Sequence, residues 1–238
     1  MILQALYHYY EAMRRAGRIA TPGLEYKPIR WQIVLQEDGS FVRIEDHKDP
    51  EDKKSKGEML LVPIGLKRSG QKPPAQLFWD NRKYILGHEE KDGVVTPTPE
   101  RMEDFVTQMK EIARQYEDNR SFRAVSLFYD RYKGSETPLP IDEGTSQIAA
   151  SDWITFRLQG ENDPVATQKD AHDYASKTYE SGERIGRCLV TGESLPLADF
   201  HARILAPGSQ AGSTIASFND DAYLSYGKKQ GANAPISK

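Results

Sequence analysis

The spacing of hydrophobic residues changes along this chain between a period of three to four and a period of two. Such a change is typical of a protein that mixes helices and strands. Residues 1–16 carry apolar side chains at helical spacing, namely Leu3, Leu6, Tyr10 and Met13. This pattern predicts a helix with one apolar face, and Gly17 predicts its end.

A β-hairpin is predicted next. Residues 30–37 and 40–46 alternate apolar and polar side chains on the two sides of Asp38-Gly39. An Asp-Gly pair between alternating runs is a strong short-range hairpin signal. The side chains expected on one face of the first strand are Trp31, Ile33 and Leu35.

The segment after the hairpin predicts a loop, a strand and a turn. Residues 47–58 are rich in charge and indicate a solvated loop, and the apolar run 59–64 predicts a short buried strand. An aromatic turn, Phe-Trp-Asp-Asn at residues 78–81, follows a basic stretch. Residues 83–86 then look strand-like.

The second half of the chain predicts two helices and then a mixed region. Helical spacing over residues 98–117 and 121–133, with a short break between them, indicates a helical hairpin. Residues 134–150 contain two prolines and form a weak boundary. Further elements are expected at residues 152–158 (strand), 164–180 (helix), 186–190 (strand) and 200–205 (a short apolar element).

These elements predict an α+β fold. It has an N-terminal helix, antiparallel hairpins in a small sheet with a helical hairpin insertion, and a second mixed α/β part. The expected division is residues 1–134, which include the basic loop, and residues 151–238. Because the tail at 213–238 is rich in Gly, Ser, Asn and Lys and ends without a core element, we expect a longer protein to continue beyond it.

Composition narrows the class of partner. The 238 residues have a formal net charge of −3, so any nucleic-acid contact must come from a local basic patch. One cysteine, Cys188, cannot form an internal disulfide and indicates a reducing compartment. The chain has neither a signal-peptide pattern nor a run of about 20 apolar residues, so we expect a cytoplasmic protein without a membrane.

The sequence offers no convincing active site. The five histidines lack metal-ligand spacing, and no phosphate-binding glycine loop occurs. The run GRCLVTGE around Cys188 resembles half of a zinc knuckle but lacks a second cysteine pair, which favours a buried structural cysteine. Acidic pairs such as Asp220-Asp221 lie in loops. We therefore expect no enzyme activity, no metal and no cofactor.

The most informative segment is residues 66–87, which begins with a basic loop at residues 66–73. It places Lys67, Arg68 and Lys72 within six residues, together with Ser69 and Gln71. Basic side chains neutralise phosphates, and a glutamine can read a base edge in a groove. The alternative is a hairpin tip with ordinary surface charge.

Two other segments supply weaker candidates for DNA contact. In the aromatic turn, Phe78 and Trp79 are expected to anchor the basic loop in the core, and Asp80 and Asn81 favour a turn. The second group of candidates is Asn81 with the tail residues Asn219, Lys228, Lys229, Gln230 and Asn233. Aromatic, lysine and asparagine residues interleave in that tail, which suits nucleic-acid contact, but a helix ending at Gly227 would explain it as well.

Four motifs in order carry a family resemblance: MILQALxxYY, VPxxxKRSG…FWDN…YxLG, GRCLVTGE and SFNxxAYxSYGKxQGxNAP. Together they cover residues 1–235 and resemble the N-terminal region of the large subunit of the type I-C CRISPR effector complex (Cascade). The resemblance implies a non-catalytic subunit that recognises the protospacer-adjacent motif (PAM) in double-stranded DNA. It also implies that the subunit aids strand separation for crRNA pairing in antiviral defence.

The resemblance implies partners as well. These are target duplex DNA, the crRNA-bound subunits at the five-prime handle and along the backbone of the complex, and a helicase-nuclease recruited after target binding. Two other readings remain. One is an assembly scaffold at the five-prime-handle end that does not read DNA, and the other is a magnesium-dependent nuclease that uses scattered carboxylates.

Overall fold

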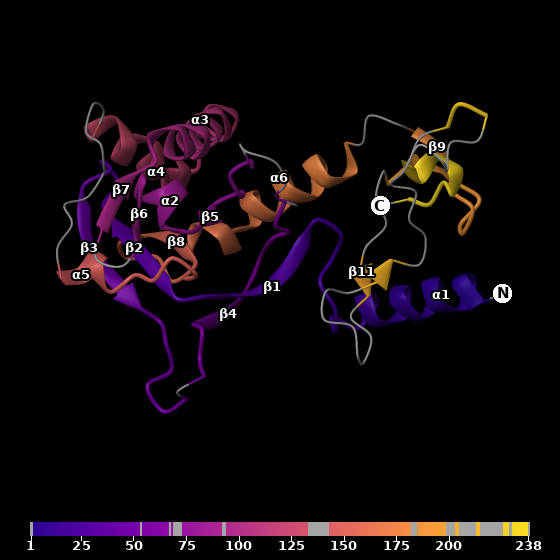
Figure 1. The fold of residues 1–238 in the computed structure, drawn as a ribbon, viewed down its shortest axis with the longest axis horizontal. Helices are drawn as coiled ribbons and strands as arrows, with labels where there is room; N and C mark the ends of the chain where they lie inside the picture. The colour runs from indigo at the N-terminus through magenta and orange to yellow at the C-terminus, as the bar shows by residue number, and fades with distance from the viewer. Residues whose placement is uncertain are drawn as a thin grey trace. The chain divides into compact units, whose positions relative to one another are not determined.

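The protein folds into two compact units (Figure 1). The larger is Leu24–Ala175, and the smaller combines Met1–Gly23 with Ser176–Lys238. The structure, a computed structural model, describes residues 2–52, 54–66, 68, 73–91, 94–132, 143–181, 185–198, 203–204, 213–214, 226–228 and 230–237. Helices and strands occur together in an α+β fold, as the sequence predicts.

A four-stranded mixed sheet is the centre of the larger unit. Its order is β3-β2-β8-β5, with β2 and β8 parallel and the other pairs antiparallel. The strands are β2 (Trp31–Leu35), β3 (Phe41–Asp46), β5 (Trp79–Asp80) and β8 (Ile154–Leu158). Residues from both sides of the 134–150 stretch therefore build one sheet.

The predicted hairpin is confirmed in β2 and β3. Gly39 has φ +80°, a backbone conformation that favours glycine, and a Cβ atom there would lie 2.5 Å from the backbone nitrogen of Phe128. The glycine is therefore needed both for the turn and for the close approach of the helix that contains Phe128.

The predicted helical hairpin is also confirmed, as α3 (Pro99–Gln115) and α4 (Arg120–Arg131). The helices lie beside the sheet, and the Phe156 ring of β8 contacts the rings of Phe105 and Phe128 at centroid distances of 6.2 and 5.8 Å (Figure 1). All five residues of β2 are buried, not only the alternate ones, because β2 lies between two strands and both of its faces are covered.

Two further antiparallel pairs complete the strands of the larger unit. The predicted strand at 59–64 is β4 (Glu58–Pro63), and it pairs with β1 (Leu24–Ile29), which the sequence pattern did not reveal. Met59 is exposed, so this strand is less buried than expected. The second pair is β6 (His88–Lys91) with β7 (Val94–Pro97).

The strand-like interpretation of residues 83–86 is wrong, because α2 (Arg82–Ile85) is a single helical turn. Asn81 caps it, and its side chain accepts a hydrogen bond from the Lys83 backbone nitrogen at 3.1 Å. Tyr84 and Ile85 are both buried. A run of four residues is too short to show a hydrophobic period, so its sequence does not distinguish a helix from a strand.

The helix expected at 164–180 is two elements. A 3-10 turn, η1 (Val165–Thr167), precedes α6 (Lys169–Glu180), and Gln168 between them is extended. A four-residue helix, α5 (Glu143–Ser146), also belongs to the larger unit. None of the described helices is both long and apolar enough to cross a bilayer.

The smaller unit contains the predicted N-terminal helix, α1 (Ile2–Arg15), whose side chains stay partly or fully exposed. The strand expected at 186–190 is shorter and forms a hairpin, β9 (Ile185–Arg187) with β10 (Ser194–Pro196). The described part of this unit also contains the short pair β11 (Arg203–Ile204) and β12 (Ser213–Thr214) and the 3-10 turn η3 (Gln230–Asn233).

Candidate nucleic-acid interface

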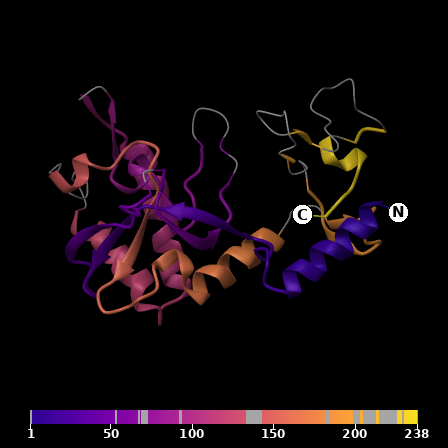
Figure 2. The same cartoon turned by 90° about the horizontal axis from the view of Figure 1, so that it is seen from below.

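The two ends of the basic loop are joined by one buried glutamine. The backbone nitrogen of Leu66 donates to Oε1 of Gln76 at 2.5 Å, and Nε2 of Gln76 donates back to the Leu66 carbonyl at 3.1 Å. The side chain therefore imitates a strand partner and fixes the separation of the two segments that flank residues 67–72. Figure 2 shows the backbone of the larger unit, which carries these segments. The described chain on the two sides of residues 67–72 is therefore held together at a defined base.

Asp80 collects hydrogen bonds at this base. Its fully buried carboxylate accepts from the backbone nitrogens of Gln76 at 2.8 Å and Asn81 at 2.7 Å, and from the Arg68 guanidinium. Burial raises the pKa of the Asp80 carboxyl, against the opposing effect of Arg68. The carboxylate thus ties Arg68, inside the basic loop, to the chain that follows it.

Tyr84 forms the other wall of the base. The Arg68 guanidinium lies over its ring at 4.1 Å, and the hydroxyl donates to the Pro73 carbonyl at 2.7 Å. Nε of Arg68 also donates to the Pro74 carbonyl at 3.1 Å. Arg68 therefore contacts protein groups on three sides.

The aromatic turn anchors this base, as the sequence predicts. Phe78 and Trp79 are buried, and the Phe78 ring stacks on Phe122 at a centroid distance of 4.9 Å. Phe78 has φ +65°, which is strained for a bulky side chain, and Thr155 holds it by donating to its carbonyl at 2.9 Å. Trp79 donates to the Pro63 carbonyl, just before the loop, at 2.9 Å.

The predicted contact residues are distributed unevenly. Arg68 and Asn81 lie at the loop base, where Arg68 pairs with Asp80 and Asn81 caps α2. Lys228 and Asn233 belong to the smaller unit, where Nδ2 of Asn233 donates to the Lys228 carbonyl at 3.1 Å. The others lie outside the described residues, wholly or in their side chains: Lys67, Ser69, Gln71, Lys72, Asn219, Lys229 and Gln230. Their DNA contacts stay predictions.

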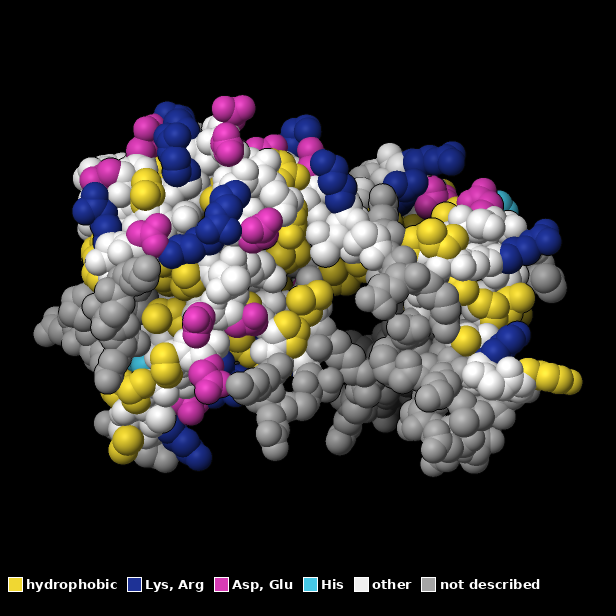
Figure 3. Space-filling view, turned by 90° about the horizontal axis from the view of Figure 1, so that it is seen from above, with side chains coloured by type: hydrophobic (Ala, Val, Ile, Leu, Met, Phe, Trp, Pro, Cys, Tyr) yellow, Lys and Arg dark blue, Asp and Glu magenta, His cyan; other side chains and the backbone are white. Residues whose placement is uncertain are grey.

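The surface on the side of α3 and α4 shows no field of one sign. Basic and acidic side chains are interspersed there (Figure 3). Ion pairs link Arg120 to Glu37 at 2.5 Å and Arg131 to Asp38 at 2.6 Å. Paired charges of this kind do not attract a polyanion. This face therefore offers no broad basic surface for a nucleic acid.

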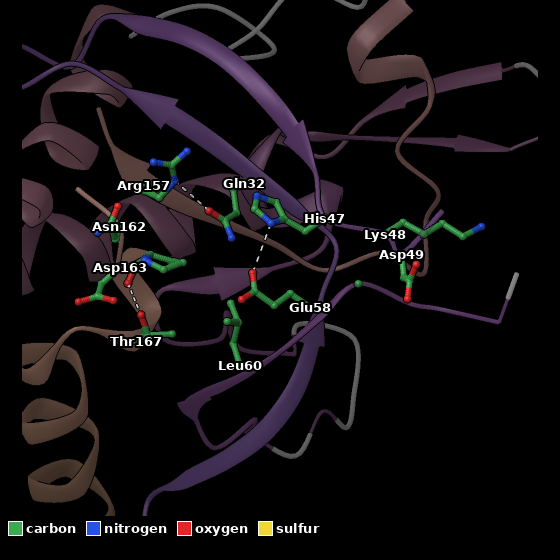
Figure 4. Close-up of a pocket in the computed structure, with 12 residues that line it drawn as sticks. Gln32, His47, Lys48, Asp49, Glu58, Leu60, Arg157, Asn162, Asp163 and Thr167 are labelled. Carbon is green, nitrogen blue, oxygen red and sulfur yellow. Dashed lines mark hydrogen bonds and ion pairs between the residues drawn. The ribbon is translucent and has the colours of Figure 1, made fainter. Parts of the chain in front are cut away.

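Sequence reasoning missed a polar hollow of about 790 Å³ in the larger unit. Its residues come from the sheet, the loop after β3, the start of β4 and the segment around η1 (Figure 4). Arg157 donates to Gln32 at 3.1 Å and to Glu45 at 2.5 Å, and His47 lies 3.3 Å from Glu58. A polar residue on each of three neighbouring strands was the available signal, but only the strand register brings them together.

The hollow favours neither an anion nor a metal. Its charged side chains are of both signs, and Arg157, His47 and Glu58 satisfy one another or Glu45. Within the described residues no group of three or more His, Cys, Asp or Glu side chains could hold a metal ion. These ion pairs and hydrogen bonds stabilise the face of the sheet that carries Gln32, Glu45 and Arg157.

Glu45 predicts a pH dependence of stability. Burial opposes its ionisation, but hydrogen bonds from Arg157, Arg43 and His47 outweigh burial and lower its pKa from 4.5 to about 2. This contribution to stability is present above pH 4.5 and is lost as the pH falls through about 2. Glu45→Gln should therefore destabilise the protein at neutral pH, and its deficit should shrink on acidification. Urea unfolding of both proteins between pH 7 and pH 3 measures this; a deficit independent of pH would contradict it.

Cys188 is buried, as predicted, in a turn of the smaller unit. The backbone nitrogens of Val190 and Ser237 each lie 3.4 Å from its sulfur, and the Ser237 hydroxyl lies at 3.5 Å. Burial raises the pKa of the thiol, but these donors outweigh it and lower the value to about 6. The turn resembles a metal-binding knuckle in its N–H to sulfur contacts, without a second cysteine anywhere in the sequence.

Comparison with known families gives one match. A family model described as CRISPR-associated protein (Cas_Csd1) matches residues 6–238. No curated protein matches the chain.

Proposed function

The chain belongs to the Cas_Csd1 family of CRISPR-associated proteins, and we propose that it is part of the large subunit of a type I-C Cascade complex, where it recognises the PAM in double-stranded DNA. The family match covers all but the first five residues, and the order of the sequence motifs supports the same assignment. The proposed subunit has no catalytic role. It presents a reading loop to duplex DNA and aids strand separation, after which the crRNA pairs with the target strand.

One observation carries this proposal: the segments before and after the basic loop are hydrogen-bonded to one buried base. Gln76, Asp80 and Tyr84 hold the chain at residues 66, 68 and 73, and Arg68 itself donates to the carbonyl of residue 74. A loop fixed at both ends loses less conformational entropy when it binds, so its few charges can act with defined geometry. A solvated hairpin tip does not require a buried carboxylate, a buried glutamine and a strained phenylalanine beneath it.

Each proposed contact has a separate chemical task. Lys67 and Lys72 neutralise phosphates, which supplies affinity for any duplex. Gln71 reads a base edge in a groove, and Ser69 donates to phosphate or base. The absence of a global basic field keeps binding dependent on this loop, since the net charge is −3.

The test is duplex binding by the reconstituted complex, with an intact motif and with a scrambled motif, across a series of salt concentrations. The proposal expects tighter binding to the intact motif and an affinity that falls as salt rises. No cleavage should occur when magnesium is added to this protein alone. Equal affinity for both duplexes would overturn the reading role and favour the assembly scaffold.

A further inference from the structure

The structure describes Arg68 within the basic loop, and its side chain contacts other groups of the protein. Its guanidinium pairs with Asp80, lies over Tyr84 at 4.1 Å and donates through Nε to Pro74 at 3.1 Å. Its side chain is only 21% exposed. Nε and Nη2, the two donors on one edge of the guanidinium, are therefore both bonded to protein groups and cannot together grip a phosphate or a guanine.

We infer that Arg68 and Asp80 form an anchor that positions the basic loop, and that Arg68 is not itself a DNA contact. This inference rests on the proposed function, because it assigns tasks within the same loop. Lys67, Ser69, Gln71 and Lys72 remain the proposed contacts. Arg68 acts through Asp80 and is a positioning residue.

The position of Asp80 explains why a carboxylate is needed. It is fully buried, and it accepts from Gln76 and Asn81 as well as from Arg68. A buried carboxylate is costly unless a cation and hydrogen bonds compensate it. Arg68 supplies that cation from within the loop, so satisfying Asp80 requires the loop to return to one position. The Tyr84 ring further limits where the guanidinium can lie.

The inference makes a prediction opposite in sign to simple electrostatics. Asp80→Asn removes a negative charge beneath the loop, which by charge alone should strengthen DNA binding and release Arg68. An anchor predicts the reverse. Both carboxylate oxygens of Asp80 accept from N–H donors, so the NH2 group of an asparagine must face either Arg68 and Gln76 or Asn81, and one side of the anchor is lost. We expect on the order of tenfold weaker binding to the motif duplex by the reconstituted complex.

Matched variants separate the two explanations. Asp130→Asn removes a carboxylate that is ion-paired with Lys110 in the same unit, and it should leave motif binding unchanged. Arg68→Gln should weaken binding as Asp80→Asn does, and the double variant should be no worse than either single one, because both remove the same anchor. Thermal unfolding of each variant controls for loss of fold. If Asp80→Asn does not fold, Arg68→Gln carries the test through its digestion by trypsin without DNA: loss of an anchor should accelerate cleavage beside Lys67, whereas loss of a DNA contact should not.

Limited trypsin digestion provides a readout that needs no DNA. Asp80→Asn should accelerate cleavage beside residues 67 and 68 several-fold, and Asp130→Asn should not. Motif binding by Asp80→Asn that equals or exceeds the wild type, with unchanged digestion, would overturn the anchor. If Lys67→Ala/Lys72→Ala leaves duplex binding intact, the proposed function fails instead, while the digestion result still decides whether the anchor exists.

Discussion

Replacement of both Lys67 and Lys72 by alanine in the assembled complex is expected to lower duplex affinity about 10- to 100-fold for every sequence. Each lysine that neutralises a phosphate releases counterions, so the slope of log affinity against log salt should fall by about 2. The measurement is binding of an intact-motif and a scrambled-motif duplex at several salt concentrations.

The matched control is Lys54→Ala/Lys56→Ala. These two lysines are exposed in the charged segment between β3 and β4, so the control removes the same charge from the same unit. It should change neither affinity nor salt slope. Gln71→Ala should have a different effect. It should reduce the difference in affinity between the intact-motif and the scrambled-motif duplex, with little change in the salt dependence of binding.

Two outcomes would contradict the loop assignment. Unchanged duplex binding by the double lysine variant would mean that the loop is ordinary protein surface. The tail residues would then be the remaining candidates for DNA contact. Failure of that variant to enter the complex would make the loop a subunit contact, as the scaffold alternative expects. Co-purification with the other subunits must therefore be equal before DNA binding is compared.

Trp79→Ala is expected to cost about 3–5 kcal/mol of unfolding free energy, the largest stability effect among the residues at the loop base. Trp79 is 1% exposed, and its indole donates to the Pro63 carbonyl at 2.9 Å. Lys27 lies over the ring at 4.9 Å, and Gly65 approaches it so closely that a Cβ atom would lie 3.3 Å away. Removing the indole leaves a large cavity and an unpaired carbonyl directly before the basic loop.

Trp153→Ala is the control for this prediction. Trp153 meets Trp79 edge to face at 5.1 Å, but it is only partly buried, so the same substitution should cost clearly less. Urea unfolding of the purified protein measures both losses. Equal losses would mean that the two rings contribute equally to stability and that Trp79 is not the anchor of the loop base.

Local signals accounted for the elements that the sequence predicted well. Asp38-Gly39 between alternating strands identified the hairpin, because that turn chemistry is set by neighbours in the chain. The helical hairpin was equally visible, since its buried faces repeat with a period that only a helix satisfies. The strand predicted at residues 83–86 was wrong because a single buried helical turn is too short to show such a period. Its N-cap, Asn81, was interpreted as part of a turn.

Only part of the candidate interface could be predicted from the sequence. The sequence by itself determined the basic loop, the aromatic anchor after it and the absence of a metal or phosphate motif, because residue identity and spacing suffice for these. The tertiary structure decided that Arg68 faces Asp80 and Tyr84, and that Gln76 bridges the loop ends. It also decided that Gln32, Glu45 and Arg157 meet on one sheet face. These contacts join residues 10 to 125 positions apart, and only the strand register and chain packing set which of many such pairs form.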